Sequence, residues 1–444
     1  MNAWEETYDV AVIGGGLAGL TAAIHIARAG ARVIVLERAS QVGGRAATHV
    51  DQGFHLNLGP HAVYNGGRMR AVLSSLGVTL HGGVPAVAGS YAWHAGRMQT
   101  LPGGFLSLLS TGLFGLGAKL ETARVLSSIG RVDAAAFDSV SVEEWVCSTA
   151  RDETVRQLLH ALIRVSTYSH APHEASAGAA LRQLQMALDG NVTYLDGGWG
   201  TVVDALVALA ERVGVRIVGN ARVGAIVHER AVRAVKLADG RTLDVAQAIV
   251  AGSPALAHAL VPRSRALERF HAAATPVRAA CLDVTLTALP RAKSRFALGI
   301  DRPLYASVHS AVARLAPAGS AMIHLAKYLA SDERDDHATI ERELETLLDR
   351  LQPGWREVVA ARRFLPSMIV SNALVTAAAG GASGRPAPGV PDVEGLYVIG
   401  DWVGDEGMLA DASFASAVKG AELVVARWQR RKRGPTDVAL GAAR

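Results

Sequence analysis

Residues 8–38 read YDVAVIGGGLAGLTAAIHIARAGARVIVLER. A β-branched apolar run ends at Ile13, and a glycine-rich turn and a helical pattern from Leu20 to Ala29 follow it. A second apolar run, Arg32 to Leu36, ends in Glu37. This order predicts a βαβ unit with a right-handed parallel crossover, the start of a Rossmann-type domain.

The glycines of this turn are spaced as dinucleotide binding requires. Gly14 permits the tight turn, Gly16 lets the backbone approach a pyrophosphate, and Gly19 lets helix and strand pack closely. The helix N-terminus favours phosphate, and the Glu37 carboxylate can accept hydrogen bonds from ribose hydroxyls. A merely flexible turn would need neither Glu37 nor the flanking strands. The predicted contacts in this segment are Gly14, Gly16, Leu17, Ala18, Gly19, Glu37 and Arg38.

The motif Gly43-Gly44-Arg45 follows a few residues later. It repeats the close backbone approach and adds a guanidinium for phosphate or flavin oxygens. Nicotinamide-binding folds do not usually carry this motif. The stretch from the first glycines through Gly-Gly-Arg resembles the FAD-binding element of the flavin-containing amine oxidase and phytoene desaturase superfamily. The resemblance implies an FAD cofactor. Non-covalent binding is predicted, because neither a cysteine nor a histidine lies in residues 395–401, which resemble the family's closing FAD motif.

Two further segments extend the resemblance. Residues 53–61, GFHLNLGPH, are similar to the family segment that passes the reactive edge of the flavin, although Asn57 stands where the family often has an acidic residue. This similarity implies cofactor contacts from Gly59, Pro60 and His61. Residues 307–319 resemble the desaturase-like branch, where amine oxidases differ.

The segment GLYVIGD, residues 395–401, looks like the closing FAD motif. The resemblance implies that Gly400 and Asp401 reach the ribityl and pyrophosphate region. Met408 and Leu409 would open a helix whose dipole stabilises the anionic reduced flavin. The family also holds the adenine through a strand backbone, at the place of Val223.

We therefore expect an α/β protein in which a discontinuous Rossmann-type FAD-binding domain carries an inserted α+β substrate domain. The predicted FAD-binding parts are residues 1–67, 191–262 and 385–430. The predicted substrate domain comprises residues 68–190, mostly helical, and residues 263–384. Residues 431–444 are expected to form a basic, flexible tail.

Composition limits the classes of partner that we expect. The net charge is +5, but the basic residues are scattered apart from the run Arg427 to Arg433, so we expect no nucleic-acid binding. Cys147 and Cys281 lack metal-type spacing, and no metal site is predicted. Without a signal sequence or membrane span, a cytoplasmic location is expected. The apolar residues 101–117 either line the substrate cavity or contact a membrane surface peripherally.

The predicted activity is hydride transfer between a substrate C–H and the flavin N5, as dehydrogenation or desaturation of a small, largely apolar organic molecule. His61 is the best catalytic candidate among the histidines. The electron acceptor, whether oxygen, a quinone or another molecule, and the oligomeric state stay open. One alternative is a flavin amine oxidase. The resemblance implies a lysine near the flavin in such an enzyme, and Lys327 is the candidate for it. Another is a non-catalytic FAD-binding chaperone or assembly factor.

Overall fold

The computed structural model describes residues 7–86, 88–333 and 336–433, so most of the predicted tail lies outside the described residues. The chain forms two compact units. Unit 1 contains the described residues up to Ala47, Val202–Ala274, and the described residues from Arg385 onward; unit 2 contains Thr48–Thr201 and Thr275–Gly384.

The chain crosses from one unit to the other four times, and three of these crossings differ from the predicted domain boundaries. The first crossing follows Ala47 rather than residue 67, because β3 (Thr48–Asp51) pairs with β4 (Phe54–Asn57), and His55 donates its N–H to Leu315 of unit 2. The third follows Ala274 rather than residue 262, because α10 (Arg265–Ala273) packs against α9 (Pro254–Leu260). The last crossing, between residues 384 and 385, is the predicted one.

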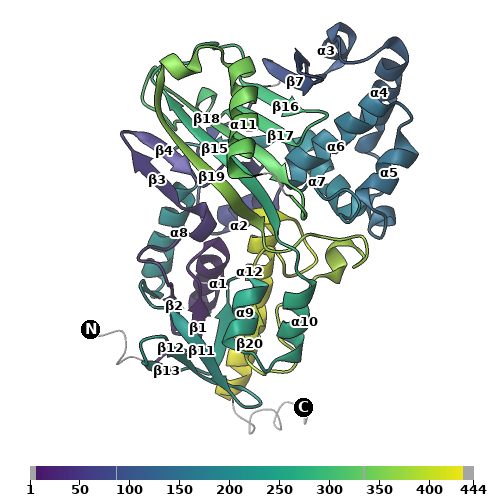
Figure 1. Ribbon diagram of the computed structural model, residues 1–444. Coiled ribbons are helices and arrows are strands. Elements are labelled where there is room, and N and C mark those ends of the chain that lie inside the picture. The colour runs from purple at the N-terminus through teal and green to yellow at the C-terminus, as the bar shows by residue number, and fades with distance from the viewer. Residues whose placement is uncertain (1–6, 87, 334–335, 434–444) are drawn as a thin grey trace. The chain divides into compact units, whose positions relative to one another are not determined.

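Unit 1 is built on a five-stranded parallel sheet of order β10-β2-β1-β14-β20 (Figure 1). Its strands are β10 (Arg216–Val218), β2 (Val33–Leu36), β1 (Val10–Ile13), β14 (Gln247–Val250) and β20 (Leu396–Val398). The central strands are buried along their whole length, as expected for a parallel sheet covered on both faces. Helix α1 (Leu17–Arg28) packs on α12 (Leu409–Arg433). This arrangement confirms the predicted Rossmann-type fold.

A small antiparallel sheet completes unit 1. It contains β11 (Val223–His228), β12 (Val232–Leu237) and β13 (Thr242–Asp244). The turn at Asp239-Gly240 joins β12 and β13, and Gly240 adopts a φ of +93° there. Helix α8 (Gly200–Arg212) precedes β10 and begins at the boundary between the units.

Unit 2 contains a seven-stranded sheet of order β19-β15-β18-β17-β16-β7-β8. Its strands are β19 (Val359–Ser371), β15 (Val277–Leu286), β18 (Ala321–Leu329), β17 (Leu304–Val308), β16 (Phe296–Gly299), β7 (Ser90–His94) and β8 (Arg97–Thr100). Helix α11 (His337–Leu351) packs against one face of this sheet (Figure 1). Its leucines are buried in the core between helix and sheet. Two short strands, β5 (Val63–Tyr64) and β6 (Gly82–Gly83), each pair with β9 (Val192–Leu195).

The described part of residues 68–190 contains six α-helices and also a hairpin, β7 and β8, at the end of the large sheet. The turn Ala95-Gly96, with positive φ at both residues, was the local signal for this hairpin. The helices of this segment are α2 (Arg68–Ser75), α3 (Phe105–Ser110), α4 (Leu116–Ile129), α5 (Val142–Thr149), α6 (Glu153–Thr167) and α7 (Ala177–Gly190). Helices α3 to α7 share one apolar core, and Ser141 with Glu144 forms a capping box at the start of α5.

Candidate functional site

The glycines of the turn between β1 and α1 differ in how closely other atoms pack against them. A Cβ on Gly14 would lie 2.5 Å from the Ala251 carbonyl oxygen, and one on Gly19 would lie 2.0 Å from the Gly14 oxygen. Packing within the chain therefore requires these two glycines. A Cβ on Gly16 would meet no described atom within 4 Å. Gly16 is also the N-cap of α1 and provides no side-chain cap, so the first N–H groups of the helix border open space.

The Glu37 carboxylate is held beside this turn. Its two oxygens accept hydrogen bonds from the backbone N–H groups of Gly15, at 2.8 Å, and Ala39, at 2.9 Å. Because each carboxylate oxygen has two lone pairs, both retain acceptor capacity for hydroxyl groups. The side chain of Arg38, by contrast, is exposed. Glu37 thus stands where its predicted contact with a ribose requires an oriented acceptor.

The second glycine motif lies against the first. The Gly43 N–H donates to the Gly15 oxygen at 2.8 Å, and Gly43 and Gly44 adopt φ angles of +120° and +55°. Arg45 then donates from Nη1 to Oδ2 of Asp401 at 2.8 Å. The Asp401 side chain is 1% exposed and that of Arg45 is 40% exposed. A buried carboxylate is thereby paired with a guanidinium that still reaches solvent.

The loop after β20 is fixed by an arginine that was not predicted. Gly400 adopts a φ of +147° and precedes Asp401. Arg385 donates to three backbone oxygens of this loop, those of Asp401, Glu406 and Gly407, at 3.2, 3.3 and 2.9 Å. Its position in a stretch rich in Gly, Ala and Pro, residues 377–391, gave no indication of this role.

Helix α12 begins where the predicted flavin contact was placed. Met408 precedes it, and Leu409, its first residue, adopts a φ of +54°. A non-glycine residue in this sparsely populated region is often found at a functional site. Val223 is the buried first residue of β11. The other predicted cofactor contacts, Gly59, Pro60 and His61, lie in unit 2.

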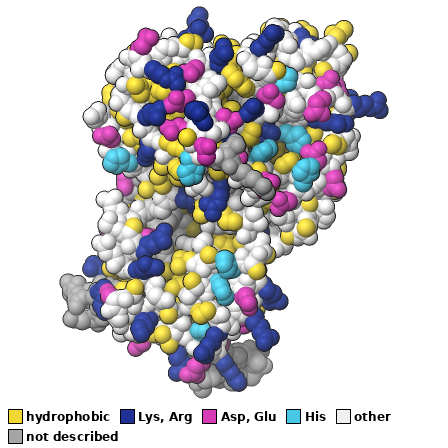
Figure 2. Space-filling model, viewed as in Figure 1, with side chains coloured by type: hydrophobic (Ala, Val, Ile, Leu, Met, Phe, Trp, Pro, Cys, Tyr) yellow, Lys and Arg dark blue, Asp and Glu magenta, His cyan; other side chains and the backbone are white. Residues whose placement is uncertain are grey.

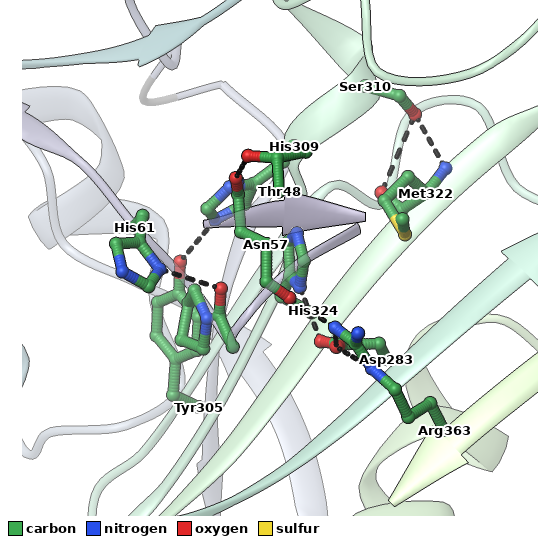
Figure 3. A network of polar contacts seen from close by, with 12 residues as sticks. Thr48, Asn57, His61, Asp283, Tyr305, His309, Ser310, Met322, His324 and Arg363 are labelled. Carbon is green, nitrogen blue, oxygen red and sulfur yellow. Dashed lines mark hydrogen bonds and ion pairs between the residues drawn. The ribbon is translucent and has the colours of Figure 1, made fainter. Parts of the chain in front are cut away.

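Unit 2 contains a buried cluster of polar side chains on one face of its large sheet (Figure 3). Asp283 of β15 and His324 of β18 are opposite each other in the strand register, and both side chains are fully buried. His324 Nδ1 lies 2.5 Å from Asp283 Oδ1. Arg363 of β19 donates to Asp283 Oδ2 from Nη2 at 2.5 Å and from Nε at 3.2 Å, and also donates to the Asn57 carbonyl oxygen.

His309 joins this cluster from the turn that follows β17. Its Nε2 lies 3.1 Å from the Tyr305 hydroxyl, and its ring stacks on Tyr194 at 3.7 Å between centroids. The His324 ring meets it edge-on at 4.6 Å. Burial, together with His324 and His61, holds the pKa of His309 well below its usual value. Burial likewise raises the pKa of Tyr305 well above its ordinary range, so both groups are uncharged near neutral pH.

The segment around His61 is anchored by Asn57. The Asn57 Oδ1 accepts from Thr48 Oγ1 at 2.7 Å and from the Trp199 N–H at 3.0 Å. A neutral amide therefore holds β3 and β4 to the turn before Trp199 at the position where the family often has an acidic residue. His61 Nδ1 lies 3.0 Å from the Gly59 oxygen, and its ring packs edge-on against Trp199 at 4.9 Å. No described residues gather three metal-ligand side chains.

The residues of unit 1 fit a bound dinucleotide. The open space at Gly16 leaves room for a pyrophosphate, and the uncapped N-terminus of α1 supplies N–H donors and a positive dipole end. Glu37 would supply the predicted acceptor for a ribose, and Arg45 would supply a cation. The fold and this arrangement define unit 1 as a Rossmann-type dinucleotide-binding unit of the flavoprotein kind.

The chain belongs to the flavin containing amine oxidoreductase family, whose model matches residues 17–424. Membership confirms the predicted family and assigns FAD as the cofactor of an FAD-dependent oxidoreductase. Non-covalent attachment stays a prediction.

Among curated proteins, the chain is similar to a carotenoid 3,4-desaturase of Haloarcula japonica, with 50% identity over 52 residues. That match covers 12% of this chain and 10% of the relative, so it spans about a tenth of the relative's length. Among solved structures, an oxidoreductase from Methanosarcina mazei aligns with a TM-score of 0.75 and 19% identity, over 93% of this chain and 100% of that one. A triple mutant of putrescine oxidase aligns with a TM-score of 0.75 and 18% identity, over 95% and 99% of the two chains. At these identities the two structures share the fold.

Proposed function

We propose that this protein dehydrogenates or desaturates an uncharged, largely apolar small molecule with FAD as the hydride acceptor. One observation carries the proposal: the carboxylate of the buried unit 2 cluster, Asp283, is already paired with the Arg363 guanidinium and hydrogen-bonded to His324. A substrate ammonium group would need a carboxylate to offset its desolvation, and the charge of this one is already offset by a guanidinium. An uncharged substrate needs no such partner.

The surroundings of the cluster favour the same class of substrate. Cys281, Tyr305 and Tyr328 belong to one buried group on the sheet, and the Tyr168 ring meets Tyr328 edge-on at 5.9 Å. Burial raises the pKa of Tyr168 and Tyr328 well above the ordinary value, which keeps both hydroxyls neutral. Aromatic and apolar walls exclude water from a hydride-transfer site without offering a charge.

The residues of unit 1 have binding and orienting roles in this proposal. The backbone at Gly16 and the α1 N-terminus would hold the pyrophosphate, Glu37 a ribose, and Arg45 with Asp401 the region between phosphate and flavin. Bound FAD supplies the acceptor for two electrons and a hydride. The protein then has to place a substrate C–H bond and accept one proton.

The amine oxidase alternative would use a lysine beside the cofactor. Lys327 Nζ lies 2.9 Å from Glu343 and 3.4 Å from Glu333. Lys327 also faces the opposite side of β18 from His324, since successive side chains of a strand alternate and the two are three residues apart. Its engagement with two carboxylates on the α11 side supports a structural role.

Anaerobic absorbance spectroscopy of the FAD-loaded protein tests the proposal. A panel of uncharged terpenoid and polyene compounds should bleach the flavin, whereas primary amines, NADH and NADPH should leave it oxidised. Bleaching by amines alone would support the amine oxidase alternative. A flavin that no compound reduces would support the chaperone or assembly factor alternative and would contradict the proposal.

We also propose that α3 and α4 rest on a membrane surface from which an apolar substrate is collected. Leu106 and Leu116 are 80% and 78% exposed, and Leu109 and Leu120 are exposed beside them. Lys119 is the charged residue between positions 101 and 120, which suits an anionic lipid surface. No described helix is long and apolar enough to cross a membrane, so the proposed contact is peripheral. Figure 2 shows the basic side chains of the viewed face interspersed with acidic ones.

A further inference from the structure

Of the two ring nitrogens of the buried His324, one has a hydrogen-bond partner and the other has none among the described residues. Its Nδ1 lies 2.5 Å from Asp283 Oδ1, whereas its Nε2 is buried without a hydrogen-bond partner among the described residues. A buried polar atom without a partner is destabilising. His309 Nδ1 is also buried without a hydrogen-bond partner among the described residues, but of these two rings His324 is the one held by a carboxylate. An unpartnered nitrogen on a ring held in this way points to a group that acts on a ligand.

Arg363 determines which nitrogen of His324 carries the proton. It donates two N–H groups to Asp283 Oδ2, so this oxygen is an acceptor in both hydrogen bonds. An ionised carboxylate can only accept hydrogen bonds, so His324 Nδ1 must be the donor. In the neutral form of the ring with Nδ1 as donor, the lone pair is on Nε2. The carboxylate both fixes this tautomer and stabilises the ring when it becomes charged.

The other titratable groups around His324 are less suited to accept a proton. His309 lies edge-on to it and has its Nε2 on Tyr305, and burial lowers the pKa of His309 well below the usual value. His61 Nδ1 lies 3.0 Å from the Gly59 oxygen, and its ring packs edge-on against Trp199. The network in Figure 3 therefore joins one carboxylate to one imidazole.

We propose that His324 is the proton acceptor of this enzyme and that Asp283 is its positioning residue. The inference rests on the proposed dehydrogenation. One substrate C–H bond gives its hydrogen and electron pair to FAD, the neighbouring C–H bond gives its proton to His324 Nε2, and the electrons left behind form the C=C bond. The products are the desaturated compound, anionic reduced flavin and an imidazolium paired with Asp283. This base replaces His61, the candidate predicted from the sequence.

Two substitutions separate this role from a structural one. His324→Asn places an amide N–H near the former Nδ1, so it keeps a donor for Asp283 and removes Nε2. His324→Gln places its amide near the former Nε2 and is not basic. Both variants should fold and bind FAD, with melting temperature and flavin content measured first. With a compound that bleaches the wild type, both should slow flavin reduction about 100-fold or more, while KM changes by less than about threefold.

The second measurement needs no substrate. In ¹⁵N-histidine spectra of the FAD-loaded protein, the His324 resonances are assigned by their loss in His324→Asn. Nε2 should be unprotonated and Nδ1 protonated in the wild type, and Asp283→Asn should mix the two tautomers. A protonated Nε2 in the resting wild type, or a His324→Asn variant that reduces its flavin at the wild-type rate, would overturn the inference. If no compound reduces the wild type, the proposed function fails, and the tautomer still tests whether His324 can accept a proton.

Discussion

Arg45 Nη1 lies 2.8 Å from Asp401 Oδ2, although 356 positions of sequence separate the two residues. Arg45 closes the Gly-Gly-Arg motif after β2, and Asp401 follows β20, two strands that are not neighbours in the parallel sheet. The sheet brings both to the edge where its strands end, which is where ligands bind in open α/β folds. The two ends of the FAD motif therefore meet in one ion pair.

Substituting Asp401→Ala should weaken FAD binding by about 10- to 100-fold, because it removes the acceptor that orients Arg45 through a charge-assisted hydrogen bond. The dissociation constant can be measured by titrating apoprotein with FAD and following flavin fluorescence. Asp405→Ala is the matched control, since Asp405 is an exposed carboxylate of the same loop. Equal FAD affinity in both variants would contradict the assignment of Asp401.

The glycines of the first turn should separate binding from folding. Gly16→Ala should keep the melting temperature of the apoprotein, because the new Cβ meets no described atom, and should weaken FAD binding at least about tenfold by blocking the pyrophosphate. Gly19→Ala should lower stability by about 1 to 3 kcal/mol, because its Cβ would lie 2.0 Å from the Gly14 oxygen.

Gly115→Ala provides the control for Gly16→Ala. Gly115 is also a helix N-cap with open space around its missing Cβ, at α4 in unit 2. Its substitution should change neither stability nor FAD affinity. A Gly16→Ala protein that binds FAD like Gly115→Ala would show that the pyrophosphate does not approach Gly16.

The sequence predicted best what neighbouring residues determine. The βαβ unit was evident because its strands, turn and helix are contiguous. Local signals of the same kind bound α11 (His337–Leu351), which has helical apolar spacing and ends just before the Pro353-Gly354 pair. The polar cluster was not foreseen. Asp283 and His324 are 41 positions apart on antiparallel strands, and their pairing depends on a register that a run of apolar residues leaves open.

Lys327 offers a test between the dehydrogenase and amine oxidase assignments. Lys327→Met keeps the length of the side chain and removes the cation between Glu333 and Glu343. Stability should fall by about 1 to 3 kcal/mol, less than for a fully buried pair because Arg302 still pairs with Glu343. Flavin reduction by an uncharged compound should stay within about threefold of the wild-type rate. A rate loss of 100-fold or more would restore Lys327 as a residue of the reaction.

Membrane contact through α3 and α4 predicts a sensitivity of vesicle binding to two leucines. The double variant Leu106→Ser with Leu116→Ser should reduce co-sedimentation with vesicles of equal parts phosphatidylcholine and phosphatidylglycerol about tenfold or more, since each buried leucine contributes about 1.5 to 3 kcal/mol. Leu188→Ser is the control, an exposed leucine on α7. Unchanged vesicle binding in the double variant would contradict the proposed membrane contact. A shift from dimer to monomer in the double variant would assign this surface to another copy of the chain.

Acid should destabilise the protein through His170, whose pKa is lowered from 6.5 to about 4 by burial first and by Arg164 second. Because the folded state binds this proton less readily than the unfolded state, the contribution of His170 to stability is complete above pH 6.5 and is lost as the pH falls toward 4. The loss is on the order of 2 kcal/mol. Urea unfolding at about pH 7 and about pH 4.5 measures it, and His170→Gln should reduce the difference between the two conditions by that amount. An equal pH dependence in both proteins would show that His170 protonates as readily in the folded chain as in the unfolded one.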